Sequence, residues 1–224
     1  MTRIKICGLT RREDALTAAE LGVNALGVIL VPESPRCVSL EKAREILEDL
    51  SPEICTVGVL RNPSREFLEE VLESKLFSAL QFHGEESPEM LREVPCITLK
   101  ALGIAGTEDL EKARVYENAG DFLLLDSRRG SRSGGTGESF DWNLLGEISF
   151  SRPFFLAGGL KKENLREALE RVNPWGVDLN SGAESAPGIK DREKMGELVR
   201  VVREYHARKP AISTEKNASC VNFL

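Results

Sequence analysis

Two side chains of this sequence suit proton transfer, the thiol of Cys7 and the carboxyl group of Asp126. Each ends a short apolar run, RIKIC from Arg3 and DFLLLD from Asp121. A thiol has a reference pKa of about 8.5, so it serves as a general base near neutrality where N–H groups or cations stabilise the thiolate. A carboxylic acid whose pKa is raised by burial donates a proton. From residue type alone, Cys7 could equally be a small buried hydrophobe and Asp126 a loop carboxylate.

Two glycine-bearing sequences, AGGLKKENL and NSGAE, follow later apolar runs and suit an anion. Glycine lets the backbone approach a phosphate closely, so that main-chain N–H groups and a helix N-terminus hold it. The alternative is that these glycines only make tight turns. The candidate phosphate-binding residues are Gly158, Gly159, Asn180, Ser181 and Gly182.

Three further polar residues lie at or near the ends of apolar runs. Arg36, in VPESPRCVS, is suited to pair with a substrate carboxylate, although surface arginines are common. His83, in QFHGEE, is either a donor at a binding site or a structural histidine. Lys5 raises the alternative of a Schiff-base lysine. It shares a strand face with Cys7 but lies one layer deeper, where a cation is unfavourable unless it is paired.

Composition limits the partners of the chain. Of 224 residues, 41% are hydrophobic and 29% charged. The net charge of −6 argues against a surface that binds nucleic acid and against a polybasic surface that binds a membrane. The start MTRIKICGLT has no apolar stretch of signal-peptide length, and no run reaches the roughly 18 apolar residues of a membrane span. We therefore expect a cytoplasmic protein with a small-molecule ligand.

The cysteines and histidines give no metal-binding pattern. Five cysteines without a CxxC pair, in a chain without a secretion signal, indicate reduced thiols. The two histidines, His83 and His206, have neither HxH nor HExxH spacing. We expect no zinc site.

The elements that must position these side chains follow a repeating pattern. Short runs rich in Val, Ile, Leu and Phe recur and are followed by charged segments with helical periodicity, as in βαβ units. The predicted strands are RIKIC from Arg3, ALGVIL from Ala25, ICTVGVL from Ile54, SALQF from Ser78, CITLKAL from Cys96, DFLLLD from Asp121, PFFLAG from Pro153 and WGVDLN from Trp175. Among the helix starts, Thr10 with Glu13 predicts a capping box, and Ser87 with Pro88 a cap followed by proline.

Eight such repeats without a linker predict an α/β fold, a single (β/α)8 TIM barrel over residues 1–208 whose closed parallel sheet is ringed by helices. The competitor is a doubly wound open sheet, but ICGLT is not the GxGxxG of that fold. In a barrel the active site lies at the carboxyl ends of the strands, where the candidate residues fall. The Gly/Ser/Arg-rich segment 127–142 suits a flap over a ligand or is a solvated loop. Residues 209–224 are expected to form a loosely ordered tail.

Several motifs together resemble the phosphoribosylanthranilate isomerase family of tryptophan biosynthesis. These are KICGLT, SPR, QFHGEE, GGTGESFDW, LAGGLKKENL, VDLNSGAE and PGIKD, which follow the family's order over about residues 3–193. The resemblance implies an Amadori rearrangement of N-(5-phosphoribosyl)anthranilate that needs no cofactor or metal. It also implies that Cys7 is the general base and Asp126 the general acid. Arg36 matches the position that contacts the anthranilate carboxylate, and the glycines match the phosphate-binding loops.

The sequence departs from the family pattern at a few positions, although no catalytic group is lost. Leu60 and Arg61 replace the usual Phe and Val, and Asn180 and Ala183 stand where SSGVE is usual. We expect a monomer or homodimer that binds a phosphorylated small molecule. The alternatives are a Schiff-base lyase that uses Lys5 and a non-catalytic barrel that only binds a phosphorylated ligand.

Overall fold

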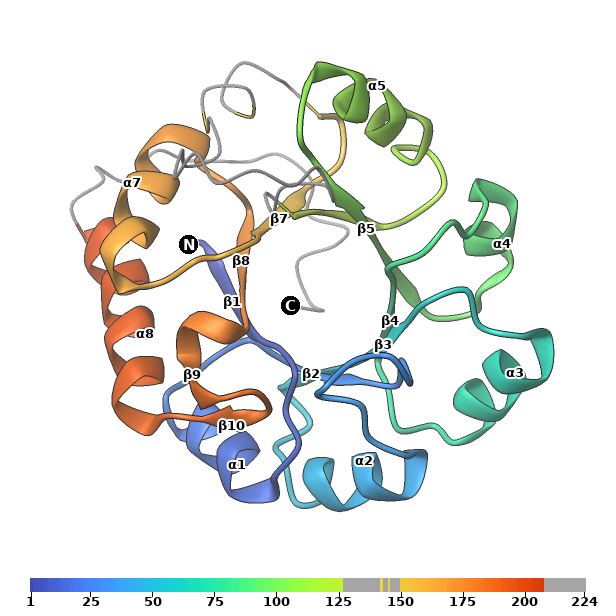
Figure 1. Cartoon of the computed structure of the whole chain (residues 1–224), viewed down its shortest axis with the longest axis horizontal. Coiled ribbons are helices and arrows are strands. Elements are labelled where there is room, and N and C mark those ends of the chain that lie inside the picture. The colour runs from blue at the N-terminus through green and yellow to red at the C-terminus, as the bar shows by residue number, and fades with distance from the viewer. Residues whose placement is uncertain (127–141, 143–144, 146–149, 208–224) are drawn as a thin grey trace.

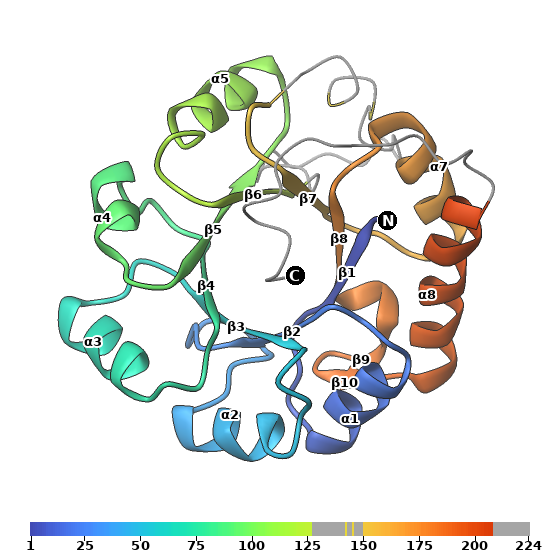
Figure 2. The same ribbon diagram turned by 180° about the vertical axis from the view of Figure 1, so that it is seen from behind.

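The computed structural model describes residues 1–126, 142, 145 and 150–207. Eight parallel strands form a closed barrel in chain order, with β8 paired to β1. Figure 1 shows the strands at the centre and the helices around them, and Figure 2 shows the same arrangement from the opposite end. The predicted (β/α)8 barrel is confirmed.

The observed strands agree with the predicted runs to within about a residue at each end. They are β1 (Arg3–Ile6), β2 (Ala25–Ile29), β3 (Cys55–Leu60), β4 (Ala79–Phe82), β5 (Ile97–Gly103), β6 (Phe122–Asp126), β7 (Phe154–Ala157) and β8 (Gly176–Leu179). The helices are α1 (Arg12–Glu20), α2 (Leu40–Leu47), α3 (Arg65–Glu73), α4 (Pro88–Glu93), α5 (Thr107–Val115), α7 (Lys162–Val172) and α8 (Arg192–Ala207). A short 3-10 turn, η1 (Ser181–Ala183), and a hairpin of β9 (Glu184–Ala186) and β10 (Ile189–Lys190) follow β8.

Strand periodicity explains why the acid faces the barrel axis. Leu123 and Leu125 of β6 pack in the cluster between the strands and the helices, whereas Phe122 and Leu124 belong to the cluster inside the barrel. Side chains alternate between the two faces of a strand, so Asp126 shares the inner face with Phe122 and Leu124. At the other end of the barrel interior, Phe122 packs against Trp175 with ring centroids 4.9 Å apart. These aromatic side chains fill the barrel near the amino ends of the strands. The barrel is therefore open at the carboxyl ends of the strands.

The helix starts are partly as predicted. Ser87 accepts a hydrogen bond from the backbone of Met90, and Pro88 is the first residue of α4. The predicted capping box of Thr10 and Glu13 is wrong, because the N-cap of α1 is Arg11. The Thr10 hydroxyl instead donates to the carbonyl of Gly188 and so joins β1 to the hairpin after β8.

Two predicted features lie outside the described residues. The segment 127–142 is described only at Trp142, and the tail 209–224 is not described. Within the described part of the chain, no helix combines the length and the hydropathy needed to cross a membrane.

Candidate active site

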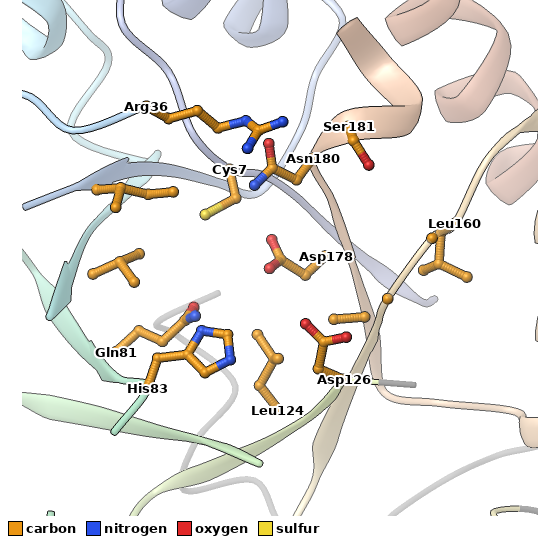
Figure 3. A pocket seen from close by; sticks show the side chains of 15 residues that line it. Cys7, Arg36, Gln81, His83, Leu124, Asp126, Leu160, Asp178, Asn180 and Ser181 are labelled. Carbon is orange, nitrogen blue, oxygen red and sulfur yellow. The ribbon is translucent and has the colours of Figure 1, made fainter. Parts of the chain in front are cut away.

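A pocket opens at the carboxyl ends of the barrel strands and gathers most of the predicted site residues (Figure 3). Its lining comes from strands all around the barrel. Of the nine candidates, eight line it: Cys7, Arg36, His83, Asp126, Gly158, Gly159, Asn180 and Ser181. The ninth, Gly182, is not in the lining and lies where two of the pocket's loops meet. The pocket therefore combines a thiol, carboxylates, an arginine and glycine loops.

Cys7 and Asp126 point into this pocket from different strands (Figure 3). Cys7 directly follows β1, and Asp126 is the last residue of β6. Both side chains are nearly buried, with 3% of Cys7 and 4% of Asp126 exposed. A ligand in the pocket would therefore meet a thiol and a carboxyl group that are both shielded from bulk water.

A buried ion pair between Lys5 and Asp178 lies at the pocket, with Asp178 in the lining. The Lys5 ammonium, with no exposed surface, donates hydrogen bonds of 2.9 Å to Asp178 and to Gln81. Lys5 and Asp178 are register partners on the adjacent strands β1 and β8. Burial would lower the pKa of Lys5, but Asp178 and the neighbouring Cys7 outweigh it and raise that pKa. Lys5 is therefore a protonated cation with a fixed partner.

The charges around Cys7 oppose one another. Burial raises the pKa of the Cys7 thiol, and the carboxylate of Asp178 raises it further. Lys5 and Lys190 act in the opposite direction, because a nearby cation favours the thiolate. The pKa of the Cys7 thiol is raised overall, so the two lysines offset only part of the effect of burial and Asp178.

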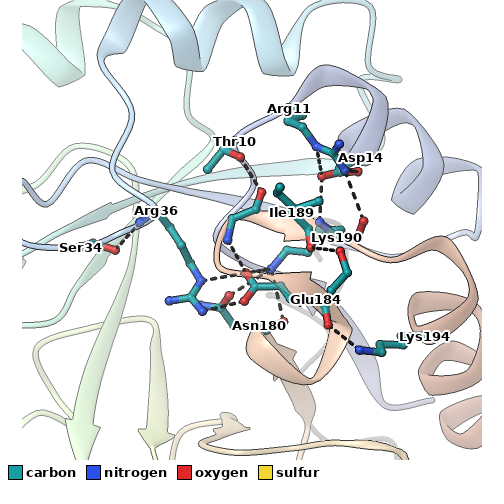
Figure 4. Close-up of polar contacts among 12 residues, drawn as sticks. Thr10, Arg11, Asp14, Ser34, Arg36, Asn180, Glu184, Ile189, Lys190 and Lys194 are labelled. Atoms are coloured by element: carbon teal, nitrogen blue, oxygen red, sulfur yellow. Dashed lines mark hydrogen bonds and ion pairs between the residues drawn. The ribbon is translucent and has the colours of Figure 1, made fainter.

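Arg36 reaches from the loop after β2 to the hairpin after β8, where Glu184 holds it (Figure 4). Its Nε and Nη2 atoms donate to the two carboxylate oxygens of Glu184 at 2.8 and 2.6 Å, a bidentate geometry. Lys190, which is fully buried, donates to Glu184 at 2.8 Å and to the side-chain oxygen of Asn180 at 3.0 Å. Burial would raise the pKa of Glu184, but Arg36 and Lys190 lower it overall. One edge of the Arg36 guanidinium is therefore committed to a permanent anion.

The loops after β7 and β8 pack closely against each other. Gly158 and Gly159 have φ of 94° and 61°, in the left-handed region that favours glycine. Asn164 supports this loop, because it donates to the carbonyl of Gly159 and accepts from the backbone of Lys161. A Cβ atom on Gly182 would lie 2.0 Å from the carbonyl oxygen of Leu160. Gly158 and Gly159 thus allow the backbone conformation of the first loop, and Gly182 allows the two loops to approach closely.

The remaining candidates lie at the mouth with different surroundings. His83 lines the pocket after β4, and its backbone N–H donates to Leu60 at 2.9 Å. Arg61, which departs from the family pattern, is exposed and is not part of the pocket lining. In the described part of the chain, no group of three or more His, Cys, Asp and Glu side chains is placed to hold a metal ion.

Sequence reasoning missed several polar residues of the site, namely Gln81, Asp178, Glu184 and Lys190. A signal existed for Asp178. It is an acidic residue in an otherwise apolar strand, and closure of the barrel places its strand beside that of Lys5. Gly8 was also missed: its φ is 73°, and a Cβ there would lie 2.7 Å from both Arg36 and Asn180.

Comparison with known proteins agrees with this geometry. The family model described as N-(5'phosphoribosyl)anthranilate (PRA) isomerase matches residues 4–201. N-(5'-phosphoribosyl)anthranilate isomerases from Petrotoga mobilis and Stutzerimonas stutzeri are 42% and 44% identical to this chain. The alignments cover 89% and 91% of this chain and 96% and 98% of those proteins.

Solved structures of phosphoribosyl anthranilate isomerases superpose closely on this chain. Phosphoribosyl anthranilate isomerase from Thermotoga maritima superposes with a TM-score of 0.84 at 37% identity, over 91% of this chain and all of that one. A phosphoribosyl anthranilate isomerase in complex with reduced 1-(o-carboxyphenylamino)-1-deoxyribulose 5-phosphate gives a TM-score of 0.81 at 35% identity, with the same coverage. A further structure, with a TM-score of 0.80 at 34% identity and the same coverage, contains monomers generated from the dimeric Thermotoga maritima enzyme. With its barrel, its motifs and these relatives, the chain belongs to the phosphoribosylanthranilate isomerase family.

Proposed function

We propose that Cys7 and Asp126 carry out the family's reaction in this chain, as general base and general acid. The activity itself follows from family membership: the chain is an enzyme of tryptophan biosynthesis that isomerises N-(5'-phosphoribosyl)anthranilate. The product is 1-(2-carboxyphenylamino)-1-deoxyribulose 5-phosphate. The observation that carries the assignment of roles is that the thiol and the carboxyl group line one pocket.

Asp126 acts first, on the closed ring of the substrate. Its carboxyl proton passes to the ring oxygen of the ribose, and the bond between that oxygen and C1′ breaks. The lone pair of the anthranilate nitrogen forms the C1′=N double bond of a Schiff base. The place of Asp126 in the pocket lining, at the carboxyl end of β6 and only 4% exposed, supports this role.

Cys7 acts second, on the opened chain. Its sulfur takes the proton from C2′, the electrons of that C–H bond form C1′=C2′, and the π electrons of the Schiff base return to nitrogen. The resulting enolamine tautomerises to the aminoketose. Lys5 and Lys190 support this role, because both act to favour the thiolate.

The two anionic ends of the substrate match two parts of the pocket. We assign the phosphate to the loops after β7 and β8, where Gly158, Gly159 and Ser181 line the pocket. We assign the anthranilate carboxylate to Arg36.

The alternative of a Schiff-base lyase is disfavoured by the state of Lys5. A lysine must lose its proton to attack a carbonyl group, and burial beside another cation is the usual means to that end. Lys5 instead pairs with Asp178 at 2.9 Å, and its pKa is raised. A non-catalytic barrel is disfavoured because both Cys7 and Asp126 are retained in the pocket.

The phosphorylated ligand is supported by the relative that holds reduced 1-(o-carboxyphenylamino)-1-deoxyribulose 5-phosphate. Of the two predicted assembly states, the homodimer is favoured by the relative from Thermotoga maritima, which is described as dimeric. Sedimentation of the purified chain distinguishes the homodimer from the monomer. A cytoplasmic location stays a prediction from the sequence.

The test of the activity is the loss of phosphoribosylanthranilate fluorescence on addition of the purified chain. We expect a first-order loss whose rate is proportional to protein concentration and unchanged by a metal chelator. Treatment with borohydride during turnover should leave no sugar phosphate attached to Lys5. Unchanged fluorescence at micromolar protein, or a covalent adduct at Lys5, would refute the proposal.

A further inference from the structure

The ammonium group of Lys5 and the sulfur of Cys7 lie close to the same point on the neighbouring strand, Gly27. An ammonium group carries three N–H donors. Two are used by Gln81 and Asp178, each at 2.9 Å. Cys7 is the further group with which the ammonium interacts by charge and by hydrogen bonding. The carboxylate and the amide therefore fix the position of a cation that lies near the thiol.

The adjacent strand leaves room for this contact. Gly27 lies on β2, next to β1 in the barrel. A Cβ atom on Gly27 would lie 2.9 Å from the sulfur of Cys7 and 3.3 Å from both Cε and Nζ of Lys5. The sulfur and the ammonium thus border the same small space, which any larger residue at position 27 would fill.

We infer that Lys5, oriented by Asp178 and Gln81, is a positioning residue that favours the thiolate form of Cys7, the form required to remove the C2′ proton. The inference rests on the proposed role of Cys7 and adds the group that sustains it. Lys5 keeps its own proton throughout the reaction and forms no bond to substrate. When the C2′–H bond breaks, the new S–H bond removes the negative charge from beside Lys5, and release of that proton restores the thiolate.

The charged side chains near Cys7 come from several strands. Because they differ in sign, their removal should shift the ionisation of Cys7 in different directions. Lys5 on β1 and Lys190 on β10 favour the thiolate, whereas Asp178 on β8 disfavours it. The other ionisable side chains of the pocket are Arg36, His83 and Asp126. Lys5 and Asp178 are partners, yet their removal should move the titration of Cys7 in opposite directions. A purely structural role of the pair predicts the same direction for both.

The experiment measures the rate at which iodoacetamide alkylates Cys7 as a function of pH. The protein is used without substrate, and the modified peptide that contains Cys7 is quantified by mass spectrometry, so the other cysteines do not interfere. We expect the midpoint of the Asp178→Asn variant to fall by at least about one pH unit, because a neighbouring charge shifts a pKa by about 1–3 units.

The Lys5→Met variant should have a midpoint at least about one unit above that of the unmodified chain. Because this variant leaves Asp178 buried and unpaired, it is at risk of not folding. The double variant Lys5→Met with Asp178→Asn carries no unpaired charge. Its midpoint should lie at least about one unit above that of Asp178→Asn alone. The acid limb of the pH profile of kcat/KM should move with the alkylation midpoint in each active variant.

A second buried ion pair provides the matched control. Lys100 on β5 donates to Glu86 at 2.7 Å, with 0% and 1% of the two side chains exposed. Neutralising it with Lys100→Met and Glu86→Gln should leave the Cys7 midpoint unchanged. The inference is overturned if the double Lys5/Asp178 variant titrates like Asp178→Asn, or if Asp178→Asn raises the midpoint. Alkylation of Cys7 needs no substrate, so it tests the inference about Lys5 separately from the isomerase activity. If the alkylation midpoints shift as expected but the protein is inactive, the isomerase proposal is refuted and the inference about Lys5 is not.

Discussion

Replacement of Gly182 by alanine should loosen the phosphate site by separating two loops. The Cβ of the alanine would lie 2.0 Å from the carbonyl oxygen of Leu160, and ordinary contact begins at 3.4 Å, so the loops must move apart by roughly 1.4 Å. Backbone conformation is not the obstacle, because Gly182 is not among the glycines with positive φ. Misplacement of catalytic or binding groups by about 1 Å reduces rates by about 100-fold. We therefore expect kcat/KM for phosphoribosylanthranilate to fall about 100-fold, mainly through KM.

The assay combines steady-state kinetics with inhibition by inorganic phosphate, which reports the anion site alone. The inhibition constant for phosphate should rise together with KM in Gly182→Ala. Gly196→Ala is the control, because Gly196 lies within α8 and the nearest atom to its Cβ would be 3.8 Å away. That variant should keep its kinetic constants and gain up to about 1 kcal/mol of stability. Unchanged phosphate inhibition in Gly182→Ala would refute the role of loop packing.

Other predictions follow from the buried charges. Glu184→Gln should raise KM about 10-fold with little change in kcat, because loss of about 1.4 kcal/mol from the bidentate contact frees Arg36 to leave its position; an unchanged KM would refute this. Burial would raise the pKa of Glu86 and Glu184, but their cationic partners lower it, so each carboxylate adds stability above its unfolded pKa of about 4.3. That stability is lost as pH falls through the folded pKa. Between about pH 5 and 3, the free energy of unfolding measured in urea should therefore change less with pH in Glu86→Gln than in the unmodified chain. Lys100→Met should lose about 3–5 kcal/mol of unfolding free energy by leaving Glu86 unpaired, and the double variant with Glu86→Gln should recover part of it.

Much of the fold was readable from the sequence because strands and helices differ in period. The eight apolar runs mark the strands, and their ends mark the mouth of the barrel. Side-chain alternation then places Asp126 on the inner face with Leu124. The same reasoning put Lys5 one layer below Cys7 and required a partner for it. The structure supplies that partner as Asp178.

The contacts that could not be predicted from the sequence join residues that are far apart in the chain and meet only in the folded structure. Arg36 and Glu184 are far apart in the chain, and no local pattern pairs them. The role of Gly182 in loop packing depends on Leu160 of the preceding loop. The capping box at Thr10 failed because its hydroxyl finds a carbonyl on the hairpin after β8, a contact that no local rule contains.

The central claim is that a thiol and a carboxyl group act as base and acid over one pocket. The most direct measurement is kcat for phosphoribosylanthranilate in Cys7→Ser and Asp126→Asn, with Cys55→Ser as a control for a buried thiol outside the pocket lining. We predict a loss of at least about 100-fold for each of the first two variants, with unchanged thermal unfolding. The Cys55 variant should turn over at the rate of the unmodified chain. Near-normal turnover in either Cys7→Ser or Asp126→Asn would contradict the account.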